Sequence, residues 1–198
     1  TFAQDKSYDL LRDKTETNIL YDRVFGISNA SEQKKQEVTS TYFLQAYHEI
    51  QRADFLQRLP KLEKLREAAS LGKVQNLVPL SILMADFETI NPAATENGDL
   101  FLNANNQFQL KSNAQNVFQK HSVNLISPLL SKSKSNQVSF ILSDELIFNT
   151  TNRTIQNIAI QTNGEETWKN ISRNSPFKVS FANGKQTVNC KIQFANGE

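Results

Sequence analysis

The chain has 198 residues, a formal net charge of +2 and a hydrophobic fraction of 38%, with 13 phenylalanines as large apolar anchors. Basic and acidic residues balance in both halves of the chain, which excludes the concentrated basic face that nucleic-acid binding or a polybasic membrane tether requires. No apolar run reaches the ~18 residues of a spanning helix. We therefore expect a folded protein that binds no nucleic acid and has no membrane span.

The first four residues, Thr1-Phe2-Ala3-Gln4, are similar to the end of a signal peptide, with small residues three places and one place before a cut after Ala3. Cys190 is the one cysteine, so an intramolecular disulfide is impossible. A single thiol is compatible with the cytosol and with an envelope protein that lacks bridges. The signal-peptide remnant favours a secreted or cell-envelope location.

Two helices are predicted, at about 40–55 and 60–71. The first has a candidate cap among residues 39–41 and a stripe of apolar residues at three- and four-residue steps, which includes Phe43, Tyr47 and Ile50. The second begins with Pro60 in the first helical position and ends before Gly72. Together they predict a helical hairpin that packs on β-strands.

From residue 77 the apolar period changes to two, which indicates a strand with apolar residues on both faces. Turn residues follow at Asn91-Pro92, and short strands are predicted at 100–102, 108–110 and 118–126. We assign residues 1–130 to one N-terminal α+β region. The lysine- and serine-rich stretch 131–136 marks the boundary of this region.

Beyond the boundary, clean β alternation is punctuated by turns at Asn163-Gly164, Asn183-Gly184 and Asn196-Gly197. Three features of this region belong together. They are strand 155–160, which leads into the first of these turns; Trp168; and the stretch 184–192, which opens as Gly-x-x-Thr-Val. This set resembles the PKD-like, immunoglobulin-type β-sandwich modules of secreted bacterial proteins. The family's turn is rich in Asp and Gly, and 161–166 departs from that pattern, so we carry over no cation-binding role.

The resemblance implies an α+β protein that is mainly β, with an antiparallel, immunoglobulin-like (PKD-like) β-sandwich at 131–198. The stretch is shorter than the ~100 residues of such a sandwich, so either preceding strands complete it or the module is truncated. The helix-and-strand region before it is similar to the N-terminal region of large secreted proteins from flavobacterium-type bacteria. That similarity implies further chain after Glu198.

We predict no catalytic, cofactor-binding or metal-binding residues, and therefore no enzyme and no cofactor. His48-Glu49 begins like a zinc-protease helix, but the second histidine is missing. Cys190 lies on the apolar face of its strand, which predicts an inert thiol. Asp86 and Glu88 share one strand face, as the paired carboxylates of sugar hydrolases could, but we interpret them as solvated charges.

Trp168 is the one candidate ligand-binding residue, and two interpretations remain open. If Ile171 points inward, Trp168 points outward and offers a platform for stacking a ligand. If Trp168 points inward, it belongs to the core, which we favour because large aromatic residues are usually buried.

Three functions follow as hypotheses. We prefer a non-catalytic extracellular or cell-envelope structural or binding module of a larger protein, whose partner is a protein or a polysaccharide. The first alternative is the carbohydrate-binding accessory region of a secreted hydrolase. The second is a protein–protein docking scaffold, which would show an exposed apolar patch on the helical hairpin.

Overall fold

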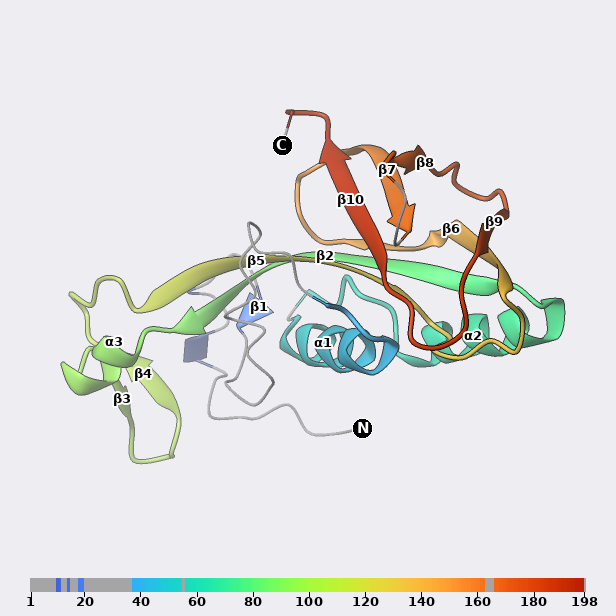
Figure 1. The fold of residues 1–198 in the computed structure, drawn as a ribbon. Helices are drawn as coiled ribbons and strands as arrows, with labels where there is room; N and C mark the ends of the chain where they lie inside the picture. Colours follow the sequence, from blue (N-terminus) through green and yellow to red (C-terminus); the bar gives the residue numbers. More distant parts are fainter. Residues whose placement is uncertain are drawn as a thin grey trace. The chain divides into compact units, whose positions relative to one another are not determined.

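The computed structural model describes residues 10–11, 14, 18–19, 37–54, 56–162 and 166–197 (Figure 1). The protein is α+β and mainly β. The helices are α1 (Ser40–Ala53), α2 (Glu63–Gln75) and α3 (Pro92–Glu96). The strands are β1 (Asn18–Ile19), β2 (Val78–Ile90), β3 (Leu100–Leu102), β4 (Phe108–Leu110), β5 (Phe118–Pro128), β6 (Gln137–Asn149), β7 (Ile155–Thr162), β8 (Lys169–Asn170), β9 (Phe177–Ser180) and β10 (Val188–Phe194).

The chain divides into two compact units, and each is described by itself. The first holds Gln45–Pro60, Ala85–Val123 and the described residues before 37; the second holds Glu37–Leu44, Lys61–Met84 and the described residues from Asn124 onward. The boundary predicted at 131 lies inside the second unit. The Thr1–Gln4 motif and the Asn163-Gly164 turn lie outside the described residues.

In the first unit, the short elements follow from local capping and pairing. Asn91 caps α3, because its side-chain oxygen accepts a hydrogen bond from the backbone N–H of Ala93, and Pro92 occupies the first helical position. The predicted strands at 100–102 and 108–110 are confirmed as β3 and β4, which pair antiparallel. A small core of Leu11, Ala94, Leu100 and Val117 lies beside them.

The turn after α1 is held by side chains that bind its backbone. Buried Asp54 accepts hydrogen bonds from the N–H groups of Arg58 and Leu59, and it pairs with the Arg58 guanidinium at 3.2 Å. The Tyr47 hydroxyl donates to the Pro60 carbonyl at 2.7 Å. Pro60 therefore ends this turn, and its predicted place as the first residue of α2 is wrong, since α2 begins at Glu63.

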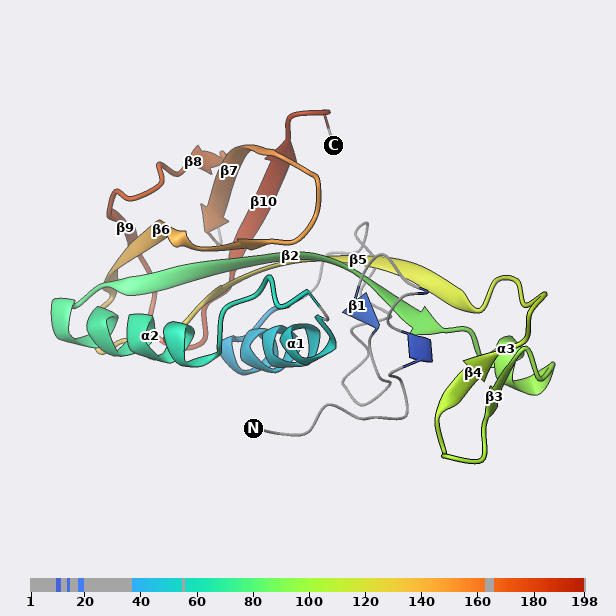
Figure 2. The same ribbon diagram turned by 180° about the vertical axis from the view of Figure 1, so that it is seen from behind.

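The second unit contains two sheets that share one apolar core. β2 pairs with β6, and β6 pairs with β9; β7 lies between β10 and β8 in the smaller sheet. In Figures 1 and 2 the smaller sheet lies on one side of β2 and β6, and α2 lies on the other. The core between the sheets draws on both; its buried members are Leu80, Ile82, Met84, Val138, Phe140, Leu142, Ile158, Ile160, Ile171, Val179 and Phe194.

One pairing departs from the antiparallel module that the sequence predicted. β6 pairs with β9 antiparallel, but it pairs with β2 parallel. A strand that precedes the predicted module thus supplies a neighbour to its first strand. Parallel strands need a long connection between them, so local turn signals do not reveal this pairing.

Gly72 has a different role from the helix end that the sequence predicted. It lies inside α2, whose C-terminal cap is Asn76 in the left-handed conformation, with φ 54°. A Cβ on Gly72 would lie 2.6 Å from the Leu77 carbonyl oxygen and 2.6 Å from the Pro79 ring. Glycine therefore allows the helix to approach the chain that enters β2.

β6 contains an irregularity opposite Ser81. From Leu80 to Ile82 on β2, the paired positions on β6 move from Leu142 to Ile147, so β6 carries extra residues there. The buried Ser81 hydroxyl donates to the carbonyl of Leu146, within the extra segment. The hydroxyl thus satisfies a carbonyl at the point where the regular ladder is interrupted.

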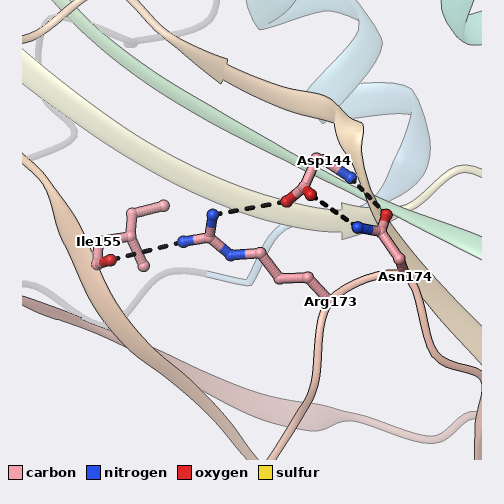
Figure 3. Close-up of polar contacts among 4 residues, drawn as sticks. All are labelled: Asp144, Ile155, Arg173 and Asn174. Atoms are coloured by element: carbon pink, nitrogen blue, oxygen red, sulfur yellow. Dashed lines mark hydrogen bonds and ion pairs between the residues drawn. The ribbon is translucent and has the colours of Figure 1, made fainter.

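The same segment of β6 is attached to the chain that follows β8 (Figure 3). Asn174 donates from its side chain to the Asp144 carboxylate at 2.6 Å and accepts from the Asp144 backbone N–H at 3.0 Å. Arg173 pairs with Asp144 at 3.5 Å and donates to the Ile155 carbonyl at 3.4 Å. We call Asp144, Arg173 and Asn174 the β6 clamp, because it joins β6, the start of β7 and the segment after β8.

The Gly72→Ala substitution tests the close approach of α2 to the start of β2. We expect it to lower the free energy of unfolding by about 1–3 kcal/mol, because backbone and a proline ring must move to admit the methyl group. Urea denaturation measures the change. Ser70→Ala, at an exposed position of the same helix, is the control and should change stability little; equal stability of both variants would contradict the close approach.

The Asp144→Ala substitution tests the clamp. We expect a loss of about 1 kcal/mol in the free energy of unfolding, mainly from the hydrogen bond to Asn174, since an exposed ion pair with Arg173 adds little. Thermal or urea unfolding provides the measurement. Glu145→Ala removes the same charge from the neighbouring exposed residue, and a loss as large in that variant would show that the clamp contributes nothing.

Candidate functional site

The outer face of the smaller sheet differs in kind from its inner face. Along β7 and β10 the inward side chains are apolar and pack on the shared core. The outward positions carry small or uncharged polar side chains with one lysine; they are Asn157, Ala159 and Gln161 on β7 and Asn189, Lys191 and Gln193 on β10. No Asp or Glu occurs in β7, β8 or β10.

Trp168 lies on this outer face because Ile171, three positions later, is buried on the inner side. Ile171 is only 9% exposed, packs in the core, and donates its backbone N–H to the carbonyl of Ile158. Trp168 precedes β8 and Ile171 follows it, so alternation through this short strand puts the two side chains on opposite sides, and Trp168 is 39% exposed. The favoured interpretation, a core tryptophan, is therefore wrong, and the outward alternative is the one observed.

The side chain of Lys191 extends from β10 to the Trp168 ring. Its ammonium nitrogen lies 4.7 Å from the centre of the Trp168 ring, within the range of a cation–π interaction. Register explains the meeting, because Lys191 and Asn170 both pair with Ala159 of the central strand, from opposite sides. Ala159 itself is only 1% exposed, so the middle of the sheet is covered at this point.

Side-chain amides join the same three strands. Asn157 donates to Asn170 at 2.8 Å, Asn189 donates to Gln161 at 3.1 Å, and Gln161 donates to the carbonyl of Glu166 at 3.3 Å. Each side-chain amide has more donor and acceptor sites than these hydrogen bonds occupy. We call Trp168, Lys191 and these amides the tryptophan face.

The chemistry that this face offers is recognition of a polar ligand. An exposed aromatic ring supplies apolar contact area, and the amides supply donors and acceptors in fixed positions. The chemical groups of a sugar, C–H surfaces and hydroxyls, match both. Sequence reasoning found Trp168 but missed its meeting with Lys191, because that meeting depends on the pairing of two strands with β7.

Cys190 points to the inner side of the same sheet. Its side chain is half-buried and packs against the shared core. Burial raises the pKa of the Cys190 thiol to about 11. The thiol is therefore protonated at neutral pH, in line with the inert cysteine that the sequence predicted.

The other candidates that the sequence offered, His48, Asp86 and Glu88, lie in the first unit, and so does His121. His121 stacks on Phe87, with ring centres 5.3 Å apart, and its Nε2 lies 2.9 Å from the Thr89 hydroxyl. The carboxylate of Asp86 accepts a hydrogen bond from the Ser122 hydroxyl, and Glu88 is buried. Glu88 is thus not the solvated charge that the sequence suggested.

His48 is half-exposed on α1, and its Nδ1 lies 3.8 Å from the carboxylate of Glu49. Among the residues that the structure describes, no three His, Cys, Asp or Glu side chains gather where they could hold a metal ion. The helices of the described part are all too short or too polar to cross a membrane.

Comparisons with known proteins give no relative. No family model matches the chain, and neither do any curated protein or solved structure.

The environment of His121 predicts a pH dependence. Burial lowers the pKa of His121 below its usual value of 6.5, so the unfolded chain binds the proton first as the pH falls. The free energy of unfolding should then decrease as the pH falls from above 6.5 toward the folded pKa. In His121→Gln, which keeps a polar partner for Thr89, this part of the pH dependence should disappear in urea unfolding at a series of pH values. A His121 ring resonance that titrates at or above 6.5 would contradict this prediction.

Proposed function

We propose that the chain is a non-catalytic binding module of an extracellular or cell-envelope protein, and that it binds polysaccharide through the tryptophan face. The observation that carries the proposal is the exposure of Trp168 on a sheet whose outward strand positions are mainly amides. The resemblance of 138–198 to PKD-like modules of secreted bacterial proteins supports the location and the absence of catalysis.

An immunoglobulin-like arrangement of the second unit is part of the proposal. Two sheets that share one apolar core are consistent with a sandwich. The parallel neighbour β2 completes the larger sheet from outside the PKD-like stretch, which corresponds to the alternative that preceding strands supply what the short module lacks.

A sugar ring has two kinds of surface, C–H groups and hydroxyls, and both match the tryptophan face. The C–H side of a pyranose ring is apolar and packs on an aromatic ring, while its hydroxyls reach to the sides. The amides of the same face, which are joined in pairs by hydrogen bonds, offer partners to those hydroxyls. Such pre-organisation lowers the entropic cost of binding.

A docking scaffold is the second candidate function, and one observation favours it. On α2, Leu71 and Val74 are 61% and 85% exposed, three positions apart and therefore on one side of the helix. Two side chains cover much less than the ~800 Å² per partner of a stable interface. We therefore prefer the tryptophan face to α2 as the binding surface.

Tryptophan fluorescence tests the proposed function directly, because Trp168 is the only tryptophan. We expect red-shifted emission that iodide quenches, and a change in emission when the chain is titrated with one of a panel of soluble polysaccharides. Isothermal titration should show that Trp168→Ala abolishes that binding. Phe101→Ala is the matched control, since Phe101 is also 39% exposed but lies in the first unit.

Blue-shifted emission that is protected from iodide and silent to every glycan would overturn the proposal. So would binding that Phe101→Ala weakens as much as Trp168→Ala does. Circular dichroism of each variant shows that the fold is retained.

A further inference from the structure

Lys191 gives the tryptophan face a charge that ordinary sugar stacking does not need. Its ammonium group stands over the Trp168 ring, where the electron-rich face of the indole holds it. Lys191 is exposed to solvent, so its charge remains available to a ligand. β7, β8 and β10 contain no Asp or Glu, and the acidic residue Glu166 borders the face beside Gln161, whose amide donates to the Glu166 carbonyl.

The position of this charge is fixed from two sides. The backbone of Lys191 is held in register opposite Ala159, and the aromatic ring restrains the end of its long side chain. A lysine held in this way loses less conformational entropy on binding than a freely moving one. A ligand that contacts the exposed part of the indole therefore lies beside a positive charge, the Lys191 ammonium over the ring.

From this geometry we infer that the preferred ligand is an acidic polysaccharide, one whose sugar rings carry carboxylates, as uronic acids do. The inference rests on the proposed function and specifies its substrate class. The sugar ring contacts Trp168, the carboxylate pairs with the Lys191 ammonium, and the hydroxyls bind the amides of Gln161 and Asn189. Neutral sugars would use the first and last contacts only.

The test compares each acidic ligand with its own uncharged form. Oligosaccharides of alginate, polygalacturonate and hyaluronan are titrated by calorimetry alongside their methyl esters, which keep the sugar and remove the charge. We expect at least one acid to bind about three- to fivefold more tightly than its ester, the factor that an exposed ion pair contributes. Raising the salt concentration should reduce this difference.

Variants assign the difference to Lys191. Lys191→Gln should remove the preference for the acid over its ester, whereas Lys191→Arg should keep most of that preference. Lys178→Gln is the matched control, because Lys178 is an exposed lysine on β9 of the other sheet. It should leave both affinities unchanged.

The outcomes separate the inference from the function on which it rests. Equal binding of acid and ester, with loss of both in Trp168→Ala, would overturn the inference and leave the polysaccharide function standing. No binding of any acidic or neutral glycan would overturn both. Polyglutamate that binds as tightly as the best uronate would show that charge alone is recognised, and would also overturn the inference.

Discussion

The second unit depends on the interruption of the β2–β6 ladder opposite Ser81. Extra residues in β6 would leave a buried carbonyl without a partner, and the Ser81 hydroxyl binds the carbonyl of Leu146 at 3.0 Å. With this bond in place, Asp144 lies on the exposed side of β6, where it binds Arg173 and Asn174. An unsatisfied carbonyl in this position would cost about 1–3 kcal/mol, comparable to a large part of the stability of a small domain.

The β6 clamp connects that interruption to the tryptophan face. Asn174 and Arg173 follow β8 closely, and Arg173 also reaches the carbonyl of Ile155 at the start of β7. The backbone N–H of Asn174 donates to the carbonyl of Leu142, so the segment is bonded to β6 before and within the extra residues. Two strands of the smaller sheet are thereby fixed to the larger one through polar contacts at their ends. The apolar core then has only to fill the space between the sheets.

The sequence predicted those features whose cause is local. The cap of α1 is an example, because the Thr39 hydroxyl accepts from the N–H of Tyr42 three residues later, and β3 and β4 are bounded by nearby turns. Gly72 and Trp168 could not be assigned correctly from local rules. Glycine commonly ends a helix, but here its missing side chain admits Pro79. The direction of Trp168 depends on the burial of Ile171 in a core to which other strands contribute, and the meeting with Lys191 depends on a register that runs through a third strand.

Three groups among the described residues have displaced pKa values, and burial is the main cause in each. Burial raises the pKa values of Tyr47 and Cys190 and lowers that of His121, so in all three the neutral form is favoured. Tyr47 and His121 lie in the first unit, and Cys190 points to the opposite side of its sheet from Lys191. Their displaced values therefore follow from packing. At the tryptophan face the charge belongs instead to an exposed ammonium that lies over an aromatic ring.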